Sequence, residues 1–320
     1  MTWQQRMNAL GQACTPFLFI IDFEQRQPVV LPLSEVNPNE LRYDFRGVNN
    51  GLPERWSEQK LVLQRSQLDA ALYGRSFAYV QQQLQRGNSF LVNLTFPTEI
   101  QINLSLLDLF CRSQALYKLW WKESLVVFSP ECFVQIANGQ ISTYPMKGTI
   151  DATLPDAEHR IRHDPKELAE HATIVDLLRN DLSRHATQVR VERFRYVEEI
   201  ATASTPLLQV SSEIVGQLPP DYHRRLGDLL SDLLPAGSVS GAPKPKTLQI
   251  IREAELGPRG YYTGVTGHFD GKRLDSAVMI RFIERVGNQC FFRSGGGITA
   301  RSIMDAEYQE LRDKVYVPVG

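Results

Sequence analysis

The chain has 320 residues, of which 42% are hydrophobic, and this is long enough for one large domain or two smaller ones. A formal net charge of −1 gives no sign of a nucleic-acid partner or of an anionic membrane. Four dispersed cysteines without a Cys-x-x-Cys pair argue against a disulfide framework or a zinc site and fit a reducing compartment: Cys14, Cys111, Cys132 and Cys290. The sequence has neither a signal-peptide pattern nor a run of roughly 18 apolar residues, so we expect a soluble cytoplasmic protein.

The first half of the chain is predicted to form strands and one long helix. Pro, Asn and Gly occur at the density of turns in Val36–Gly51, which is predicted as a loop. Gln67–Gln85 repeats apolar residues at helical spacing. Asn138 and Gly139 form a strong two-residue hairpin signal between alternating strands. Runs of β-branched and aromatic residues predict strands at 17–23, 28–33, 88–96 and 125–144.

The second half mixes helices and strands. A long amphipathic helix begins at Pro165, a residue that suits the first helical turn. Further helices are predicted at 222–234, 247–255 and 302–316, and strands at 188–196, 207–215, 261–269, 277–284 and 289–299. Because strands follow strands in hairpins, we expect an α+β fold in which helices flank antiparallel sheets.

Two pairs of glutamates have the spacing of neighbours on one helix face: Glu167 with Glu170, and Glu307 with Glu310. A single pair of this kind is most often part of a solvated helix face. Two pairs on different helices open a second option, because four converging carboxylates would suit a hard divalent cation such as Mg²⁺. Spacing alone does not decide between the two.

Two glycine-rich stretches and one arginine are candidates for binding an anion. Pro235–Pro243 and Arg293–Thr299 could each present backbone N–H groups to an anion, or could be tight turns. Neither has the Walker A or the dinucleotide-binding pattern, so nucleotide binding is a poor interpretation. Arg281 stands in an apolar run, where a charge is costly unless it is paired, so it binds either a substrate carboxylate or a structural acid.

Lys147, in the stretch YPMKGTID, and Glu131 flank the Asn138-Gly139 hairpin, and residues so placed on paired strands can lie close together. A lysine becomes a nucleophile when burial or a neighbouring cation lowers its pKa, and a carboxyl group beside it can be a general acid. A surface ion pair worth under about 1 kcal/mol is the plainer interpretation of the two residues.

Seven successive blocks together resemble the signatures of the chorismate-utilising enzymes: SPECF, YPMKGTI, DPKELAEHATIVDLLRNDL, LLPAGSVSGAPKPKTLQIIREAE, RGYYTGVTGHFDG, SAVMIRFIE and SGGGITARSIMDAEYQELRDK. They follow the family's order between Asn88 and Val315. Within the family the chain is most similar to aminodeoxychorismate synthase component I. Anthranilate synthases have alanine in place of Lys147, and isochorismate and salicylate synthases carry a water-activating lysine on the strand that matches Phe90–Thr95, which has none.

The resemblance implies a fold and a domain organisation. The family fold is a sandwich of two facing antiparallel β-sheets, with helices packed outside and the active site between the sheets. For this chain it implies a single chorismate-binding catalytic domain over residues 1–320, made of a shortened N-terminal part, 1–87, and a signature-bearing core, 88–317. Because the N-terminal part is short, inhibition by tryptophan is not expected.

The resemblance also implies a reaction. Lys147 resembles the nucleophile that adds to C2 of chorismate, and Glu131 resembles the general acid that protonates the departing C4 hydroxyl. Ammonia from a separate glutamine amidotransferase subunit, component II, would then give 4-amino-4-deoxychorismate for para-aminobenzoate and folate synthesis in an Mg²⁺-dependent, transaminase-type reaction. Gln209 replaces a histidine of relatives that release pyruvate, which disfavours an anthranilate synthase; a silent chorismate-binding subunit is the other alternative.

Finally, the resemblance implies ligand contacts. Glu170 and Glu310 resemble direct Mg²⁺ ligands, and Glu167 and Glu307 resemble ligands that act through water. The implied substrate contacts are Tyr262 and Arg281 at the enolpyruvyl carboxylate, Gly295 and Gly297 as a backbone carboxylate cradle, Lys314 as a further cation, and Ser238 near the ring carboxylate.

Overall fold

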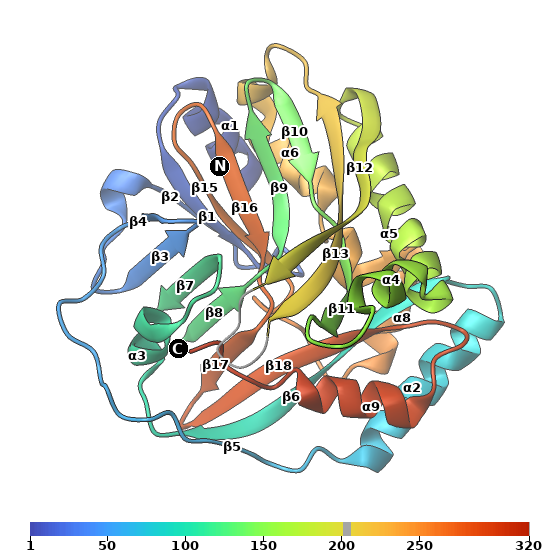
Figure 1. Ribbon diagram of the computed structural model, residues 1–320. Helices are drawn as coiled ribbons and strands as arrows, with labels where there is room; N and C mark the ends of the chain where they lie inside the picture. The colour runs from blue at the N-terminus through green and yellow to red at the C-terminus, as the bar shows by residue number, and fades with distance from the viewer. Residues whose placement is uncertain (201–205, 320) are drawn as a thin grey trace.

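Two antiparallel β-sheets form the centre of the structure, a computed structural model that describes residues 1–200 and 206–319 (Figure 1). Sheet A consists, in these residues, of β1 (Phe17–Ile21), β2 (Val29–Pro32), β9 (Cys132–Ala137), β10 (Gln140–Thr143), β11 (Met146–Asp151), β12 (Thr187–Ile200), β13 (Leu207–Gln217), β15 (Val265–Phe269) and β16 (Leu274–Val278). Sheet B consists of β3 (Leu41–Phe45), β4 (Val48–Asn49), β5 (Leu63–Arg65), β6 (Leu91–Ile102), β7 (Tyr117–Trp121), β8 (Leu125–Ser129), β14 (Gly241–Ala242), β17 (Phe282–Val286) and β18 (Gln289–Ile298).

The strand orders place distant segments side by side. In sheet A the order is β11-β13-β10-β9-β16-β15-β1-β2, and β12 pairs with the other edge of β13. In sheet B the order is β14-β6-β18-β17-β8-β7-β3-β4, and β5 also pairs with β6. The hairpin between β9 and β10 turns at Asn138 and Gly139, whose φ angles of 53° and 76° confirm the expected turn.

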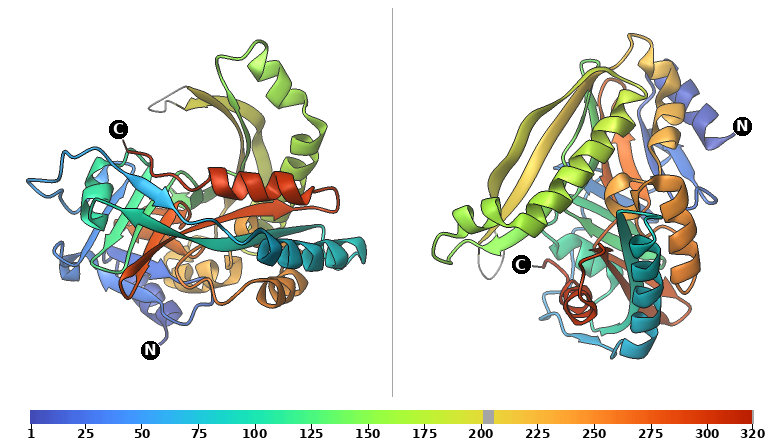
Figure 2. Two further views of the ribbon diagram at one scale, coloured as in Figure 1. Left: turned by 90° about the horizontal axis from the view of Figure 1, so that it is seen from below. Right: turned by 90° about the vertical axis from the view of Figure 1, so that its right-hand side faces the viewer.

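Helices cover the outer faces of both sheets (Figure 2). They are α1 (Trp3–Gln12), α2 (Ala70–Gln85), α3 (Leu106–Arg112), α4 (Ala157–His163), α5 (Pro165–Ser183), α6 (Leu226–Leu233), α7 (Gly237–Ser240), α8 (Lys244–Ala254) and α9 (Met304–Asp313), with 3₁₀ turns η1 (Leu33–Glu35) and η2 (Tyr222–Arg225). No helix in the described ranges is long and apolar enough to cross a membrane.

Strand β1 shows how the sequence builds the layers. All five of its residues are buried. Phe17 and Phe19 pack with α1 and α6 on the outer face of sheet A, whereas Leu18 and Ile20 pack against sheet B. Because both faces are covered, the strand is a continuous apolar run rather than an alternating one. The expected α+β sandwich of two antiparallel sheets is therefore confirmed.

Two local predictions were wrong. Residues Val36–Gly51 contain β3 and β4 rather than only a loop, because Leu41, Tyr43 and Phe45 alternate inward into the core between the sheets. Arg281 does not stand inside a strand: it lies between β16 and β17 with φ 53°, where the chain passes from sheet A to sheet B. The apolar sequence on both sides of it concealed this break.

Candidate active site

One cavity of about 770 Å³ collects all the site residues predicted from the sequence. Its wall is built from strands of both sheets, from α7, and from the helices α5 and α9. In Figure 2, α5 lies against β12 and β13, and α9 lies along β18. The predicted residues that line it are Glu131, Lys147, Glu167, Glu170, Ser238, Tyr262, Arg281, Gly295, Gly297, Glu307, Glu310 and Lys314.

Lys147 lies on β11, which is a separate strand from the β9–β10 hairpin. The pairing of β11 with β13 is irregular between Met146 and Thr149, and Gly148 within this irregular stretch has φ 83°. Lys147 Nζ lies 3.0 Å from Glu170 Oε2. Burial lowers the pKa of Lys147, but the charge and hydrogen bond of Glu170 outweigh it, so the pKa is raised above its ordinary value. The geometry therefore holds Lys147 as an ammonium ion and does not supply the lowered pKa that a nucleophilic lysine needs.

Glu131 immediately precedes β9 and does not pair with Lys147. Its Oε1 accepts a hydrogen bond from Ser238 Oγ. Burial raises the pKa of Glu131, and the Ser238 hydroxyl, Lys147 and Arg281 lower it by less, so the net pKa is raised. A raised pKa favours the protonated form of the carboxyl group, which is the form that a general acid needs. The sequence did not indicate this contact between Ser238 and Glu131.

The glycine-rich end of β18 presents backbone groups to the cavity. The pairing of β18 with β17 ends at Arg293, whereas its pairing with β6 continues to Ile298. Lys314 Nζ donates to the Gly295 carbonyl at 2.8 Å, so this carbonyl points away from β6. Within a strand, the N–H and the C=O of one residue point to the same edge. The N–H and C=O of the residue two positions further along point to that edge as well. The N–H groups of Gly295 and Gly297 therefore point to the edge of β18 that β17 leaves uncovered, the edge at which they could donate to an anion.

Arg281 and Tyr262 stand on the wall between the two sheets. The Arg281 guanidinium lies over the ring of Tyr316, 4.9 Å from its centroid. Among the described residues, Arg281 Nε is buried and has no hydrogen-bond partner, so it can donate to a bound anion. Burial raises the pKa of Tyr262 to about 12, so its phenol remains a neutral hydrogen-bond donor.

The four predicted metal ligands come from two helices, α5 and α9. Glu167, Glu170 and Glu310 all raise the pKa of Lys147 by their charge, so the acids of both helices converge near one ammonium group. Glu307 is buried and accepts a hydrogen bond from Ser302 Oγ at 2.7 Å. Carboxylate oxygens are the ligand type that Mg²⁺ prefers, and in this respect the site fits the ion.

The acids do not form a finished metal cage. Within residues 1–200 and 206–319, no three His, Cys, Asp or Glu side chains lie close enough together to hold a metal ion as they stand. Lysine ammonium groups instead contact one acid of each helix: Lys147 contacts Glu170, and Lys314 Nζ lies 2.7 Å from Glu310 Oε1.

Asn93 and Tyr316 are among the further polar residues that line the cavity and that were not singled out from the sequence. Asn93 lies opposite Gly297 in the pairing of β6 with β18, and its Oδ1 is buried without a hydrogen-bond partner in the described part of the chain. A polar residue inside the apolar run LVNLT was the available signal for it. Gln209, by contrast, was singled out and also lines the cavity.

Known proteins are similar to this chain in sequence and in fold. The profile of the family described as "chorismate binding enzyme" matches residues 33–319. An "Uncharacterized PabA-like protein" of Pasteurella multocida (strain Pm70) is 53% identical over 317 residues, covering 99% of this chain and 98% of its own length. Aminodeoxychorismate synthase component 1 of Escherichia coli (strain K12) is 33% identical over 275 residues, which cover 78% of this chain and 57% of that protein.

Relatives of another activity match equally well. Anthranilate synthase component 1 of Arthrobacter globiformis is 33% identical over 311 residues, covering 91% of this chain and 54% of that protein. The crystal structure of anthranilate synthase component I from Streptococcus pneumoniae TIGR4 superimposes with a TM-score of 0.68 at 27% identity, covering 82% of this chain and 60% of that one. On the strength of the match over residues 33–319, the chain belongs to the chorismate binding enzyme family.

Proposed function

We propose that this protein is component I of an aminodeoxychorismate synthase and converts chorismate and ammonia to 4-amino-4-deoxychorismate, a precursor of para-aminobenzoate and folate. The observation that carries the proposal is the placement of Lys147 and Glu131 in one cavity with four carboxylates from α5 and α9. A lysine as nucleophile, a carboxyl group with a raised pKa as proton donor and a set of oxygen ligands are the parts that this reaction needs.

In the proposed reaction Lys147, which Glu170 holds as an ammonium ion, first loses a proton to solvent, and the resulting amine bonds to C2 of chorismate. The ring double bonds shift, the C4–O bond breaks, and Glu131 gives its proton to the departing hydroxyl, which leaves as water. Ammonia then bonds to C4, the double bonds shift back, and Lys147 is expelled as the free amine. The new ammonium group at C4 loses a proton, which returns to Glu131. The covalent route divides one difficult displacement into two easier steps.

The remaining residues of the cavity would bind the substrate. Arg281 and Tyr262 would donate to the enolpyruvyl carboxylate, and the N–H groups of Gly295 and Gly297 would cradle a carboxylate. Glu170 and Glu310 would hold Mg²⁺ directly and Glu167 and Glu307 through water, with Ser238 and Lys314 nearby. When bound, Mg²⁺ would neutralise and orient the ring carboxylate.

Ammonia would come from a glutamine amidotransferase partner. No cysteine of the printed sequence lies in a Gly-x-Cys-x-Gly elbow, so the chain offers no glutaminase nucleophile of its own. The naming of relatives as "component 1" agrees with a two-component enzyme. Free ammonium at high concentration should replace the partner in an assay.

Anthranilate synthase component I is the second candidate, favoured by the equal identity of the Arthrobacter globiformis relative. Gln209 counts against it, because a glutamine side chain cannot act as an acid–base group when pyruvate is eliminated. The two products are readily separated, because anthranilate is fluorescent and appears together with pyruvate.

The test incubates the purified protein with chorismate, ammonium and Mg²⁺ and identifies the product by chromatography and mass spectrometry. We expect 4-amino-4-deoxychorismate without pyruvate. Lys147→Ala should abolish turnover, whereas Lys272→Ala, at an exposed turn, should not. Full turnover in Lys147→Ala would contradict the covalent route, and unchanged Mg²⁺ dependence in Glu170→Ala would contradict the metal assignment. No loss of chorismate with the wild-type protein would favour a silent binding subunit.

A further inference from the structure

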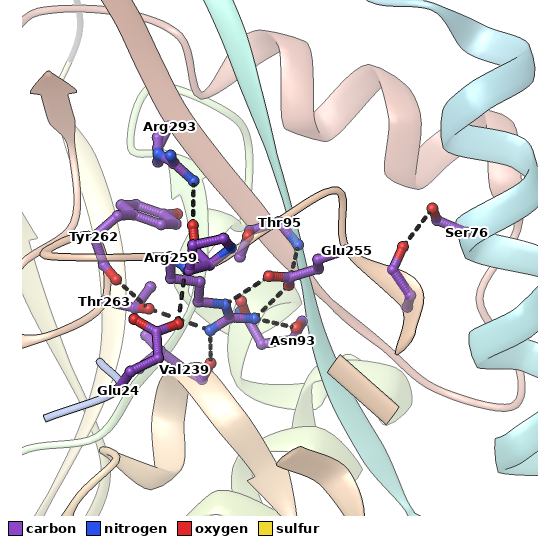
Figure 3. A network of polar contacts seen from close by, with 12 residues as sticks. Glu24, Ser76, Asn93, Thr95, Val239, Glu255, Arg259, Tyr262, Thr263 and Arg293 are labelled. Carbon is purple, nitrogen blue, oxygen red and sulfur yellow. Dashed lines mark hydrogen bonds and ion pairs between the residues drawn. The ribbon is translucent and has the colours of Figure 1, made fainter. Parts of the chain in front are cut away.

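A fully buried arginine lies directly behind the cavity wall. Arg259 is 1% exposed, and all five of its N–H donors are used (Figure 3). Its Nε and Nη2 donate to the two carboxylate oxygens of Glu255 at 2.9 and 2.6 Å. Nη1 donates to the Val239 carbonyl at 2.7 Å and to Thr263 Oγ1 at 3.2 Å, and Nη2 also donates to the Asn93 carbonyl at 2.7 Å.

Two of these contacts lead straight to predicted substrate contacts. Val239 directly follows Ser238, and Thr263 directly follows Tyr262. Arg259 therefore hydrogen-bonds to the residue that follows Ser238 and to the residue that follows Tyr262. Arg259 itself does not line the cavity. The turn 259–262 is closed by a hydrogen bond from the Tyr262 N–H to the Arg259 carbonyl at 3.2 Å.

The other contacts lead to the glycine-rich strand. Asn93 pairs with Gly297, and Thr95 pairs with Gly295, in the register of β6 with β18. The Glu255 Oε1 that accepts from Arg259 also accepts from the Thr95 N–H at 3.0 Å. The ion pair thus fixes β6 at the two positions that face the proposed carboxylate cradle.

The ion pair is itself held from behind. The Glu24 carboxylate accepts from the backbone N–H groups of Arg259 and Gly260 at 2.9 and 3.0 Å, and the guanidinium lies 4.5 Å from the centroid of the Phe23 ring. A buried ion pair is weak evidence for stability, since apolar residues of the same volume are often as stable. The planar guanidinium instead fixes relative positions, because its five N–H groups donate in set directions to several chain segments at once.

We propose that Arg259, braced by Glu255, is a positioning residue that fixes Ser238, Tyr262 and the strand Gly295–Gly297 relative to one another. This inference rests on the proposed function, in which those residues bind chorismate. Arg259 has no role in the chemical steps. It holds three parts of the binding site, which lie apart in the sequence, in fixed positions relative to one another.

The test compares two buried cations. Arg259→Lys keeps the charge but not the planar fork that reaches Val239 and Asn93 together. Lys118→Met is the matched control: Lys118 is a buried cation that pairs with Asp44 at 3.3 Å, and neither of these two residues lines the cavity. In folded protein we expect Arg259→Lys to raise KM for chorismate and lower kcat/KM by about 10²-fold, whereas Lys118→Met keeps the wild-type kcat/KM.

A second measurement does not depend on chorismate. Amide hydrogen exchange, followed by mass spectrometry, should become faster at residues 236–241 and 260–264 in Arg259→Lys, and not in Lys118→Met. Wild-type kcat/KM together with wild-type exchange in folded Arg259→Lys would overturn the proposal. If Arg259→Lys does not fold, Thr263→Val decides by the same two measurements: faster exchange at 260–264 with a higher KM supports the proposal, and wild-type values overturn it. If the wild-type protein does not convert chorismate, the proposed function fails, and the exchange measurement alone decides on Arg259.

Discussion

Gly297 has no side chain, and this leaves space beside the Lys147 amine. A substitution that fills this space is the sharpest test of the site geometry. A methyl carbon added at Gly297 would lie 3.3 Å from Lys147 Nζ and 3.1 Å from Leu91 Cδ1. Ordinary contacts of this kind are about 3.5–4.0 Å, so each neighbour must retreat by a few tenths of an ångström. Leu91 is buried and can give way only with its packing neighbours, whereas the flexible end of Lys147 can move away from the new methyl group.

The expected effect of Gly297→Ala on stability is small. Gly297 does not have a positive φ, so alanine fits its backbone, and the loss of unfolded-state freedom stabilises by about 0.4–1 kcal/mol. The tight contact offsets this gain. The effect on activity should be larger, because a misplacement of about 1 Å can cost 10²-fold in rate, and a shift of about 0.3–0.5 Å should therefore cost about tenfold in kcat/KM.

Gly296→Ala is the matched control on the opposite face of β18. Its methyl carbon would lie 3.5 Å from Glu307 Oε2 and 4.0 Å from Glu310 Oε1, which are ordinary contact distances. Chorismate consumption and urea unfolding should be measured for both variants and for the wild type. Equal kcat/KM for Gly297→Ala and the wild type would refute the reasoning, because it would mean that the position of the Lys147 amine does not matter for turnover.

Three further predictions concern a proton, a pH dependence and a helix contact. Glu131→Gln should lower kcat by about 10²–10⁴-fold while KM changes little, because glutamine keeps the shape but has no proton to give; an unchanged kcat would exclude the acid role. Burial lowers the pKa of His268 below its ordinary 6.5, so the unfolded chain takes up a proton first and stability is lost as the pH falls below about 6.5. The loss in urea midpoint between about pH 7.5 and about pH 5.5 should accordingly be smaller in His268→Gln, and an equal loss would contradict this. Gly227→Ala would place a methyl carbon 2.3 Å from the Gln4 carbonyl oxygen, so it should cost about 1–3 kcal/mol in urea unfolding and speed hydrogen exchange in α1, and wild-type stability would show that α1 does not pack there as described.

Much of the fold follows from local patterns. The alternation in β9 and β10, the Asn138-Gly139 turn and the helical spacing in α2 were read correctly because burial and periodicity agree there. β3 was missed because its three inward residues are bounded by turn-forming residues, and only packing between the sheets makes it a strand. The short helix α3, with its Ser105 and Asp108 capping box, was also not predicted, since seven residues give little periodicity.

The sequence predicted which residues form the site better than it predicted the contacts between those residues. The resemblance to chorismate-utilising enzymes assembled twelve residues that the structure brings to one cavity. It did not indicate that Lys147 contacts Glu170, or that Ser238 donates to Glu131. These partners depend on the irregular pairing around Gly148 and on the approach of α7, which are tertiary features without a local sequence signal. The chemical roles of the residues remain predictions.

The distribution of charge in the cavity gives a physical reason for a divalent cation. Chorismate carries two carboxylates, and Arg281 and the N–H groups at the end of β18 can receive one of them. The carboxylates of α5 and α9 line the same cavity and would repel the second. Lys147 and Lys314 reduce this repulsion, but an amine that is to attack the substrate must give up its positive charge. A cation held by the glutamates would reduce this repulsion and would also draw Glu170 away from Lys147, so in the proposed reaction metal binding would be coupled to the supply of the nucleophile.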